Sequence, residues 1–460
     1  MIVDLEPYPS YTNSGVEWLG AVPDGWQVRR LGSIARPVSR RGRADLPLLS
    51  VLREKGVIRR EDGDGNHNVV PEDLTNYKVV DPGDLVINKM KAWQGSLGVA
   101  DTRGIVSPAY FVYRLRVIDR RYAHTLLRSR PYVDAFAAVS SGVRIDQWDL
   151  SPIGLKSTPV LIPPAEDQAS IVVFLDRIDA RIQQFIAAKE RLIALLEEEK
   201  NAVIYRAVTA GLDPQVSLKP SGVDWLGDVP HHWDMGPLGH SVASSVTGTW
   251  GEEPDGDNDV ICVRVADFDR VRRRVQPCPD TLRSVPVADR RRRRLEVGDL
   301  LIEKSGGGDN LPVGTVVLFD RKIDAVSSNF VTRLRPAAGY RPEYLLYLHW
   351  ALYARRVNVR SIKQTTGIQN LDLRSYLSER VAFPPPAEQE AIAGYLEGAV
   401  GEIDRVVETA RVQIRLLREY RTRLTADAVT GKLDVRGAAE HLRDPAGSAI
   451  DVRLAEESAG

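Results

Sequence analysis

Two stretches of the chain space their apolar residues at alternating steps of three and four, at residues 167–207 and 392–424. In the first they are Ile171, Leu175, Ile178, Ile182, Phe185, Leu192, Leu196 and Val203, interrupted by Lys189; in the second, Ile392, Leu396, Ala399, Ile403, Val406, Ala410, Leu417, Tyr420 and Leu424. Such a heptad seam lays an apolar stripe along a helix, and a partner helix must cover it. We predict two long helices that pair as an antiparallel coiled coil. The alternative is two separate amphipathic helices, each lying on its own domain.

An internal repeat accompanies the two stretches. Residues 14–20 read Ser-Gly-Val-Glu-Trp-Leu-Gly and residues 221–227 read Ser-Gly-Val-Asp-Trp-Leu-Gly, and each phrase is followed by Val-Pro and a tryptophan. Shorter matches then follow: 82–87 with 297–302, 106–107 with 326–327, 148–150 with 371–373, and 162–164 with 383–385. Because these matches occur in the same order in both halves of the chain, they indicate a duplicated unit. In each copy a domain ends at a proline stop and a long helix follows.

Within each half, short β-branched runs bounded by glycine and proline predict strands. They are residues 85–87, 104–116, 260–265, 314–319 and 330–334, while residues 121–129 and 342–354 predict helices. The pattern is α+β and lacks the regular strand and helix alternation of a doubly wound nucleotide fold. We therefore expect two tandem α+β domains at residues 1–163 and 214–384, long helices at 164–213 and 385–436, and a mobile tail at 437–460.

Charge and cysteine content narrow the class of protein. The 460 residues carry 62 basic and 62 acidic side chains, a balance that argues against a chain coating nucleic acid by itself. The charges are nevertheless divided, because arginines gather in residues 264–294 and acids in residues 166–200. Cys262 and Cys278 suggest reduced thiols rather than a disulfide framework. No run of eighteen apolar residues or leader pattern occurs, so we expect a cytoplasmic protein without a membrane partner.

A search for catalytic motifs finds none that is complete. The sequence has no phosphate-binding Gly-rich loop, no zinc-spaced Cys and His set, no nucleophile elbow and no Asn/Asp-Pro-Pro-Tyr/Phe tetrapeptide. Asp299, Glu303 and Lys304 superficially resemble the catalytic triad of a nuclease. Glu303 and Lys304 are adjacent, however, and adjacent residues of a strand point to opposite faces, so they could not act at one site. The chain is therefore not expected to be an enzyme.

Polar segments in both halves predict a binding face. The first segment, residues 89–96, contains Lys89, Lys91, Trp93, Gln94 and Ser96. Lysines can neutralise phosphates, and a glutamine amide matches the edge of an adenine. A solvated turn with Trp93 folded into the core is the alternative.

The corresponding segment of the second half has Lys304, Ser305 and Asn310 around three glycines, which permit close backbone approach to a ligand. A second pair of polar segments contains Arg144 and Gln147 in the first half and Lys363, Thr365, Gln369 and Asn370 in the second. These residues complete the candidate DNA contacts. The arginine run at 290–294 is either a phosphate clamp or a solvated loop.

The repeated phrase, the two variable domains and the two proline stops leading through Asp/Glu-Gln into long helices together resemble the specificity subunit of type I restriction-modification systems. The resemblance covers residues 8–436. It implies that each variable domain is a target-recognition domain for one half of a split, asymmetric DNA sequence, and that the paired helices act as a spacer and dock methyltransferase subunits. Individual base-reading residues cannot be carried over, because recognition domains of this family differ widely.

The resemblance also implies where the chemistry takes place. The subunit itself would hold no cofactor. Two methyltransferase subunits would bind S-adenosylmethionine, and motor/endonuclease subunits would use ATP and Mg²⁺. Two other classes stay open on the sequence: a stand-alone DNA-binding regulator and a coiled-coil protein scaffold.

Overall fold

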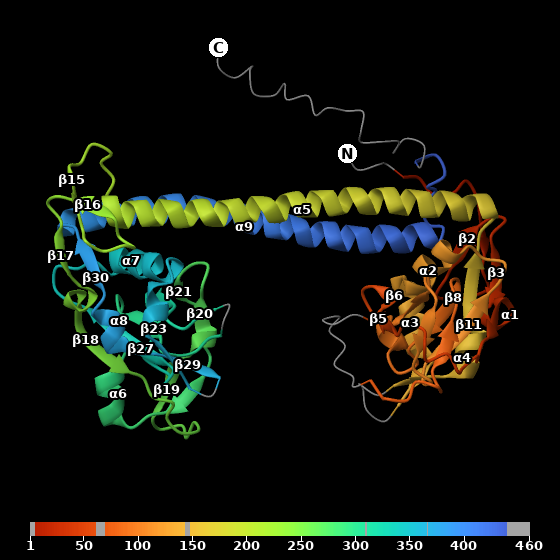
Figure 1. Cartoon of the computed structure of the whole chain (residues 1–460), viewed down its shortest axis with the longest axis horizontal. Coiled ribbons are helices and arrows are strands. Elements are labelled where there is room, and N and C mark those ends of the chain that lie inside the picture. Colours follow the sequence, from red (N-terminus) through yellow and green to blue (C-terminus); the bar gives the residue numbers. More distant parts are fainter. Residues whose placement is uncertain (1–4, 61–69, 143–147, 309–310, 366, 439–460) are drawn as a thin grey trace, which may run out of the picture. The chain divides into compact units, whose positions relative to one another are not determined.

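The computed structural model describes residues 5–60, 70–142, 148–308, 311–365 and 367–438. The chain divides into two compact units. Unit 1 comprises Met1–Ala188 and Gln413–Gly460, and unit 2 comprises Lys189–Val412. Each unit contains one α+β domain and a segment of each long helix (Figure 1). The predicted α+β class and the internal repeat are therefore confirmed within the described ranges.

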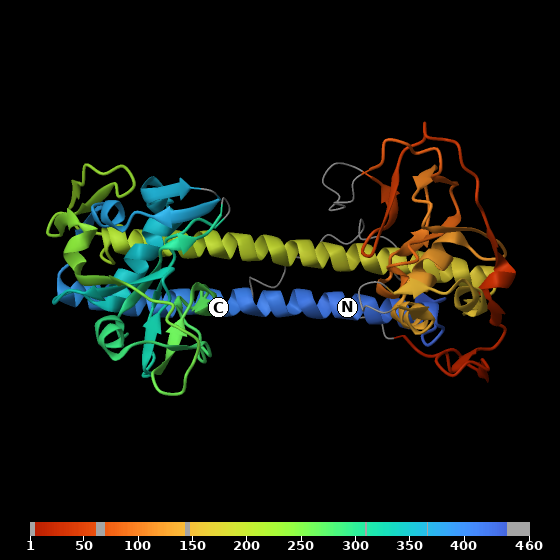
Figure 2. The ribbon, with the colours of Figure 1, turned by 90° about the horizontal axis from the view of Figure 1, so that it is seen from below.

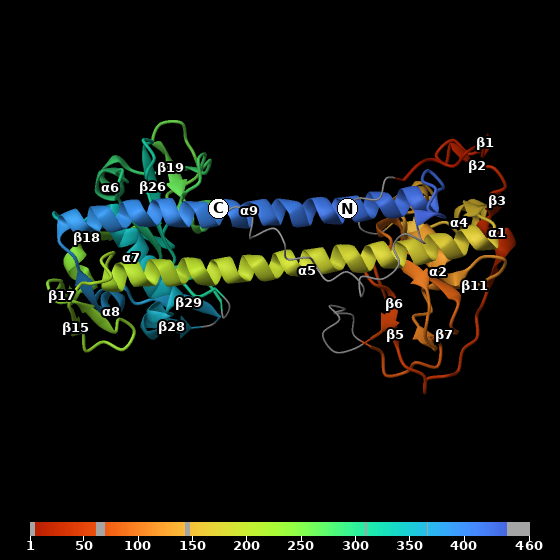
Figure 3. The ribbon, with the colours of Figure 1, turned by 90° about the horizontal axis from the view of Figure 1, so that it is seen from above.

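The two long helices are α5, Ala165–Ala210, and α9, Pro386–Val429. Within each unit, their segments run side by side (Figures 2 and 3). In unit 2, Glu197 pairs with Arg411 and Lys200 pairs with Asp404, so residue numbers rise along α5 as they fall along α9. The helices are therefore antiparallel, as predicted.

The predicted seam was wrong at several positions. Phe185 is 51 % exposed, whereas Ile186 beside it is buried. Likewise Val406 is 47 % exposed and Val407 is buried. Heptad spacing cannot choose between two adjacent apolar residues, because an α-helix with 3.6 residues per turn drifts relative to a strict 3.5-residue repeat. Contact with the partner helix decides which of the two is buried.

The domain of unit 1 is built around a four-stranded sheet in the order β4-β11-β8-β9. Its elements are β1 (Tyr11–Asn13), β2 (Ala21–Pro23), β3 (Gln27–Arg30), α1 (Leu31–Ile34), β4 (Ala35–Pro37), β5 (Leu49–Leu52), β6 (Gly56–Arg59), β7 (Lys78–Val80), β8 (Asp84–Ile87), η1 (Ala92–Gln94), β9 (Leu97–Val99), β10 (Gly104–Val106), β11 (Phe111–Leu115), α2 (Arg120–Arg128), α3 (Arg130–Ala138), β12 (Ser140–Ser141), β13 (Asp149–Leu150), α4 (Pro152–Ser157) and β14 (Pro159–Ile162). The single strand predicted at 104–116 is two strands, because Ser107 and Tyr110 close a turn between them.

The domain of unit 2 extends the same order to six strands, β18-β27-β23-β25-β21-β20. Its elements are β15 (Leu218–Pro220), β16 (Asp228–Pro230), β17 (Asp234–Pro237), η3 (Leu238–Ser241), β18 (Val242–Thr247), β19 (Asp259–Val263), η4 (Val265–Asp267), β20 (Phe268–Asp269), β21 (Arg274–Val275), β22 (Leu282–Ser284), α6 (Val287–Arg293), β23 (Leu300–Glu303), β24 (Ser305–Gly306), β25 (Val316–Leu318), β26 (Ala325–Ser327), β27 (Val331–Pro336), α7 (Pro342–Ala354), η5 (Val357–Ser361), β28 (Ile362–Thr365), β29 (Ile368–Leu371), α8 (Leu373–Leu377) and β30 (Arg380–Phe383). The helix predicted at 342–354 has those bounds.

A glutamine attaches each domain to its long helix. The buried amide of Gln168 donates from Nε2 to the carbonyl of Pro163 at 2.8 Å, and its Oε1 accepts from the backbone N–H preceding α2 at 2.7 Å. Gln389 makes the equivalent bonds to Pro384 and to the N–H preceding α7, each at 2.9 Å. One side chain thus joins the proline stop, the start of the long helix and a domain helix.

Unit 2 also contains a buried cluster of charges. The side chains of Lys200 and Arg273 are each only 3 % exposed. Between them lies Asp404, whose carboxylate oxygens are 2.9 Å from Lys200 Nζ and 3.5 Å from Arg273 Nη1. The Arg273 guanidinium also lies 4.2 Å from the ring centroid of Trp350. Asp404 therefore links α9 to α5 and to the domain of unit 2.

The buried imidazole of His349 generates a pH prediction. His349 lies on α7, within 2.8 Å of the Tyr376 hydroxyl, and burial lowers its pKa to about 4. In the unfolded chain the pKa is about 6.5, so the unfolded chain binds the proton more tightly. Stability is therefore retained above pH ~6.5 and should fall by about 1.4 kcal/mol per pH unit between ~6.5 and 4.

Urea unfolding followed at several pH values would test this, with His349→Gln expected to flatten the pH dependence. His231→Gln, which removes an exposed imidazole, serves as the matched control and should keep the parent's pH dependence. Equal pH dependence for the parent and His349→Gln would contradict the prediction.

Candidate nucleic-acid interface

The first candidate segment follows β8 as a closed turn of unit 1. The N–H of Lys91 donates to the carbonyl of Asn88 at 3.0 Å, and Gly95 ends η1 with a φ of 87°, a left-handed conformation that favours glycine. Lys89 Nζ lies 2.7 Å from the carboxylate of Asp149. Lys91 is exposed, so its charge faces solvent.

Trp93 adopts neither of the two expected arrangements. Its ring is half-buried against Trp148, with centroids 5.5 Å apart, and its Nε1 donates to the carbonyl of Met90 at 3.2 Å. Gln94 beside it is half-buried. Ser96 is only 4 % exposed, which does not favour its predicted role as a DNA contact. Lys91, Trp93 and Gln94 remain accessible.

In unit 2 the two candidate segments form one sheet. β24 pairs with β29, and β29 pairs with β28, so segments expected as loops are short strands. The Ser305 hydroxyl donates to Asn370 Oδ1 at 2.6 Å, which ties the two segments together. Lys304 is half-buried, and Lys363 is 74 % exposed with its Nζ 2.6 Å from Asp372.

Gln369 has a structural role. It is 7 % exposed, and its Oε1 accepts from the N–H of Val313 at 3.3 Å. This burial and hydrogen bond favour a structural role over a base contact for Gln369. Asn370, the next residue along β29, is half-buried and offers its amide at the edge of this surface.

The remaining candidates fall partly outside the described residues. Arg144, Gln147 and Asn310 lie outside them, and Thr365 is described only as the last residue of β28, opposite Ile368.

Equivalent hydrogen bonds join the two polar segments in both units. The N–H of Leu150 donates to the carbonyl of Lys89 at 3.0 Å, and the N–H of Leu371 donates to that of Lys304 at 2.8 Å. Leu150 therefore corresponds to Leu371, which corrects the predicted match of 148–150 with 371–373. The two polar segments of each domain meet at the same place in the fold.

The arginine run is a helix rather than a loop. Residues 287–293 form α6, and three arginines of the run pair with Asp324 or Asp289. Arg291 and Arg292 are exposed. Two acids thus engage three of the five arginines, so the run keeps a net positive charge and the phosphate clamp stays a prediction.

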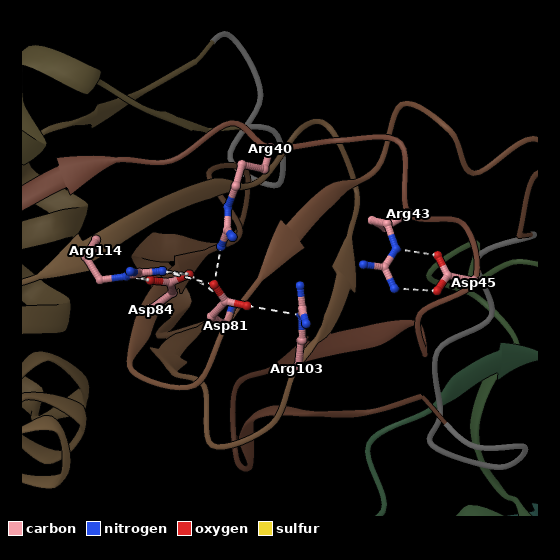
Figure 4. A network of polar contacts seen from close by, with 7 residues as sticks. All are labelled: Arg40, Arg43, Asp45, Asp81, Asp84, Arg103 and Arg114. Atoms are coloured by element: carbon pink, nitrogen blue, oxygen red, sulfur yellow. Dashed lines mark hydrogen bonds and ion pairs between the residues drawn. The ribbon is translucent and has the colours of Figure 1, made fainter.

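A cationic cluster that the sequence did not reveal lies in unit 1 (Figure 4). The carboxylate of Asp81 pairs with Arg40, with Arg103 at 3.2 Å and with Arg114 at 3.1 Å. Arg114 also pairs with the buried Asp84. The hydrogen bond from Arg40 lowers the pKa of Asp81, so the carboxylate is ionised at neutral pH. These arginines lie far apart in the sequence, and only the fold brings them together.

Comparisons with known proteins give a consistent result. No family model matches the chain. The type I restriction enzyme StySPI specificity subunit of Salmonella potsdam is 20 % identical over 441 residues, which cover 92 % of each chain. The EcoKI specificity subunit of Escherichia coli K12 is 21 % identical over 323 residues, which cover 68 % of this chain and 66 % of that protein.

Solved structures also match the chain along most of its length. A chain from a study of the assembly and conformational transition of the type I restriction-modification system covers 90 % of this chain and 99 % of its own, with a TM-score of 0.66 and 17 % identity. The chain resembles the specificity subunits of type I restriction enzymes. The HsdS subunit of Thermoanaerobacter tengcongensis shares the fold, with a TM-score of 0.50, 18 % identity, and coverage of 90 % of this chain and 98 % of its own. The relatives are named as specificity subunits, which agrees with the prediction that this chain is not an enzyme.

The described residues of the chain give two further findings. None of their helices is long and apolar enough to cross a membrane. Nor do they bring three His, Cys, Asp or Glu side chains together in a geometry suited to a metal ion.

The contrast between Gln369 and Lys363 generates a stability prediction. Gln369→Ala would leave the buried N–H of Val313 without its acceptor and should lower the free energy of unfolding by about 1–3 kcal/mol. Lys363→Ala on the neighbouring strand removes a 74 % exposed side chain and should change it by less than about 0.5 kcal/mol. Urea unfolding midpoints of the full chain would measure both. Equal effects of the two changes would contradict the structural role of Gln369.

Proposed function

We propose that this chain is the sequence-specific DNA recognition subunit of a type I restriction-modification complex, and that it reads a bipartite, asymmetric target. One observation carries the proposal. Two duplicated domains join two polar segments through the same backbone hydrogen bond, from Leu150 to Lys89 and from Leu371 to Lys304. The relationship to specificity subunits along 92 % of the chain supports it.

The accessible side chains on the polar segments differ between unit 1 and unit 2, which favours two different DNA half-sites. Unit 1 offers Lys91, Trp93 and Gln94, whereas unit 2 offers Lys363 and Asn370. Amides can pair with the N6 and N7 edge of adenine, and lysines with phosphates or guanine. Because the two sets differ, each domain should prefer its own short sequence.

We assign catalysis and cofactors to partner subunits. In the cytoplasm, two methyltransferase subunits would dock on this chain and bring S-adenosylmethionine, and motor/endonuclease subunits would bring ATP and Mg²⁺. Its 62 basic and 62 acidic residues fit a division of labour in which the partners supply much of the phosphate neutralisation. The spacer between the half-sites would follow the length of α5 and α9, which continue from one unit into the other.

Mapping of modified adenines across the host genome, in strains with and without this gene, tests the proposal. We expect one split, asymmetric motif to lose its methylation in the deletion strain and to regain it when the gene is returned. If a functioning methyltransferase is present and every motif keeps its methylation, the proposed role is wrong. The surviving candidates would then be a stand-alone regulator or a protein scaffold.

The helices generate a second prediction about spacing. A heptad inserted in α5 after Ala188 and another in α9 after Val412 would keep the seam paired and add about 10 Å to each helix. The half-site sequences should stay the same while the unread spacer lengthens, by at most roughly 3 base pairs at 3.4 Å each. Methylation mapping of the variant reads the spacer directly. A length-preserving control, in which exposed seam-flanking residues are exchanged, should keep the parent's spacer, and an unchanged spacer in the insertion variant would refute the idea.

A further inference from the structure

We propose that unit 1 contacts the DNA backbone through the β7 patch, a phosphate-binding surface separate from the residues that read bases. The patch consists of Arg40, Arg41, Lys78, Arg103 and Arg114, which surround β7. The inference rests on the proposed DNA-recognition function and adds which side chains supply the non-specific part of binding.

The exposure of the arginines around Asp81 is the first argument. The side chains of Arg40 and Arg103 are each 50 % exposed and that of Arg114 is 45 % exposed, whereas Asp81 is 23 % exposed. A guanidinium carries five N–H donors, and a carboxylate accepts about four hydrogen bonds. One carboxylate therefore orients three guanidiniums, whose contacts Figure 4 shows, and their combined donors exceed what it can accept.

The charge balance is the second argument. The patch has five basic side chains, and the acids paired within it are Asp81 and the fully buried Asp84, so five minus two leaves an excess of three positive charges. Burial lowers the pKa of Lys78, and repulsion from Arg41 and Lys89 lowers it further. Cations so close together repel one another in the free protein, and a phosphate chain would relieve that repulsion.

Backbone pairing holds the patch in place, which is the third argument. The N–H of Val79 in β7 donates to the carbonyl of Arg40 at 2.8 Å. On the other side, Gly104 of β10 pairs with Val80, which places Arg103 beside Asp81. Guanidiniums fixed in this way match phosphate geometry with little loss of conformational freedom.

The patch adjoins the candidate base-reading segment. Lys78 Nζ donates to the carbonyl of Tyr110 at 2.6 Å, and Asn88, the residue before that segment, donates from Nδ2 to the Tyr110 hydroxyl at 3.3 Å. A duplex that lies along residues 89–96 would therefore bring a phosphate chain toward β7. Phosphate contacts fix register and orientation on the duplex, and base edges give the sequence information.

The test uses the full chain assembled with its methyltransferase subunits and a labelled duplex that carries the mapped target. Arg40→Gln and Arg103→Gln should each weaken binding on the order of tenfold at moderate salt, and each should reduce the slope of log Kd against log salt concentration by about 0.9. The ratio of affinities for the target and for a mismatched duplex should stay unchanged, because phosphate contacts do not read sequence.

Two matched variants serve as controls. Arg43 lies near the patch but is paired with Asp45 through two hydrogen bonds of 2.7 and 2.6 Å (Figure 4), so Arg43→Gln should keep the parent's salt slope. Arg40→Lys keeps the positive charge and should restore most of the slope, which separates loss of charge from loss of folding.

Three outcomes would overturn the inference. The first is that Arg40→Gln and Arg103→Gln both keep the parent's salt slope, and the second is that Arg43→Gln lowers the slope as much as they do. The third is that the ratio of affinities for the target and the mismatched duplex changes while the salt slope does not. If the parental complex fails to prefer its own target over a mismatched duplex, the proposed function fails instead. The two failures are therefore distinguishable.

Discussion

The apolar stripe on each long helix cannot remain in water, and this constraint organises the whole chain. In unit 1, Ile171 and Phe174 of α5 share a core with Leu424 and Ala428 of α9. In unit 2, Ile204 of α5 is buried with α9 residues from the other end of that helix. Each unit is therefore completed by segments far apart in sequence. Neither half of the duplicated chain could bury its own helix alone.

The parts that repeat and the parts that vary have different physical roles. The repeated parts are attachments: the glutamine that joins the proline stop to the long helix, and the hydrogen bond that joins the two polar segments. The varying parts are exposed side chains on those segments. A scaffold that fixes backbone positions twice, while surface residues differ, suits a protein that must recognise two unlike sequences.

The features predicted from the sequence depend on local pattern. Both long helices, the helix at 342–354 and the duplicated order follow from periodicity and from matching phrases, and the structure confirms them. The sequence did not predict burial that is decided by distant residues. Ser96 and Gln369 look like surface polar residues in the sequence, yet contacts from elsewhere in each domain cover them.

The cluster around Asp81 was missed for a related reason. Arg40, Arg103 and Arg114 have no shared motif, and β-pairing alone brings them together.

The buried charges of unit 2 give the helix pair a property that its apolar seam lacks. A heptad seam is periodic, so a slip of seven residues would still bury apolar side chains. Such a slip would replace Asp404 with Arg411 in one direction, which places a third cation against Lys200 and Arg273. Breaking a buried ion pair costs about 3–5 kcal/mol. The cluster therefore opposes a slip in that direction and adds a directional constraint on register that the periodic apolar seam does not supply.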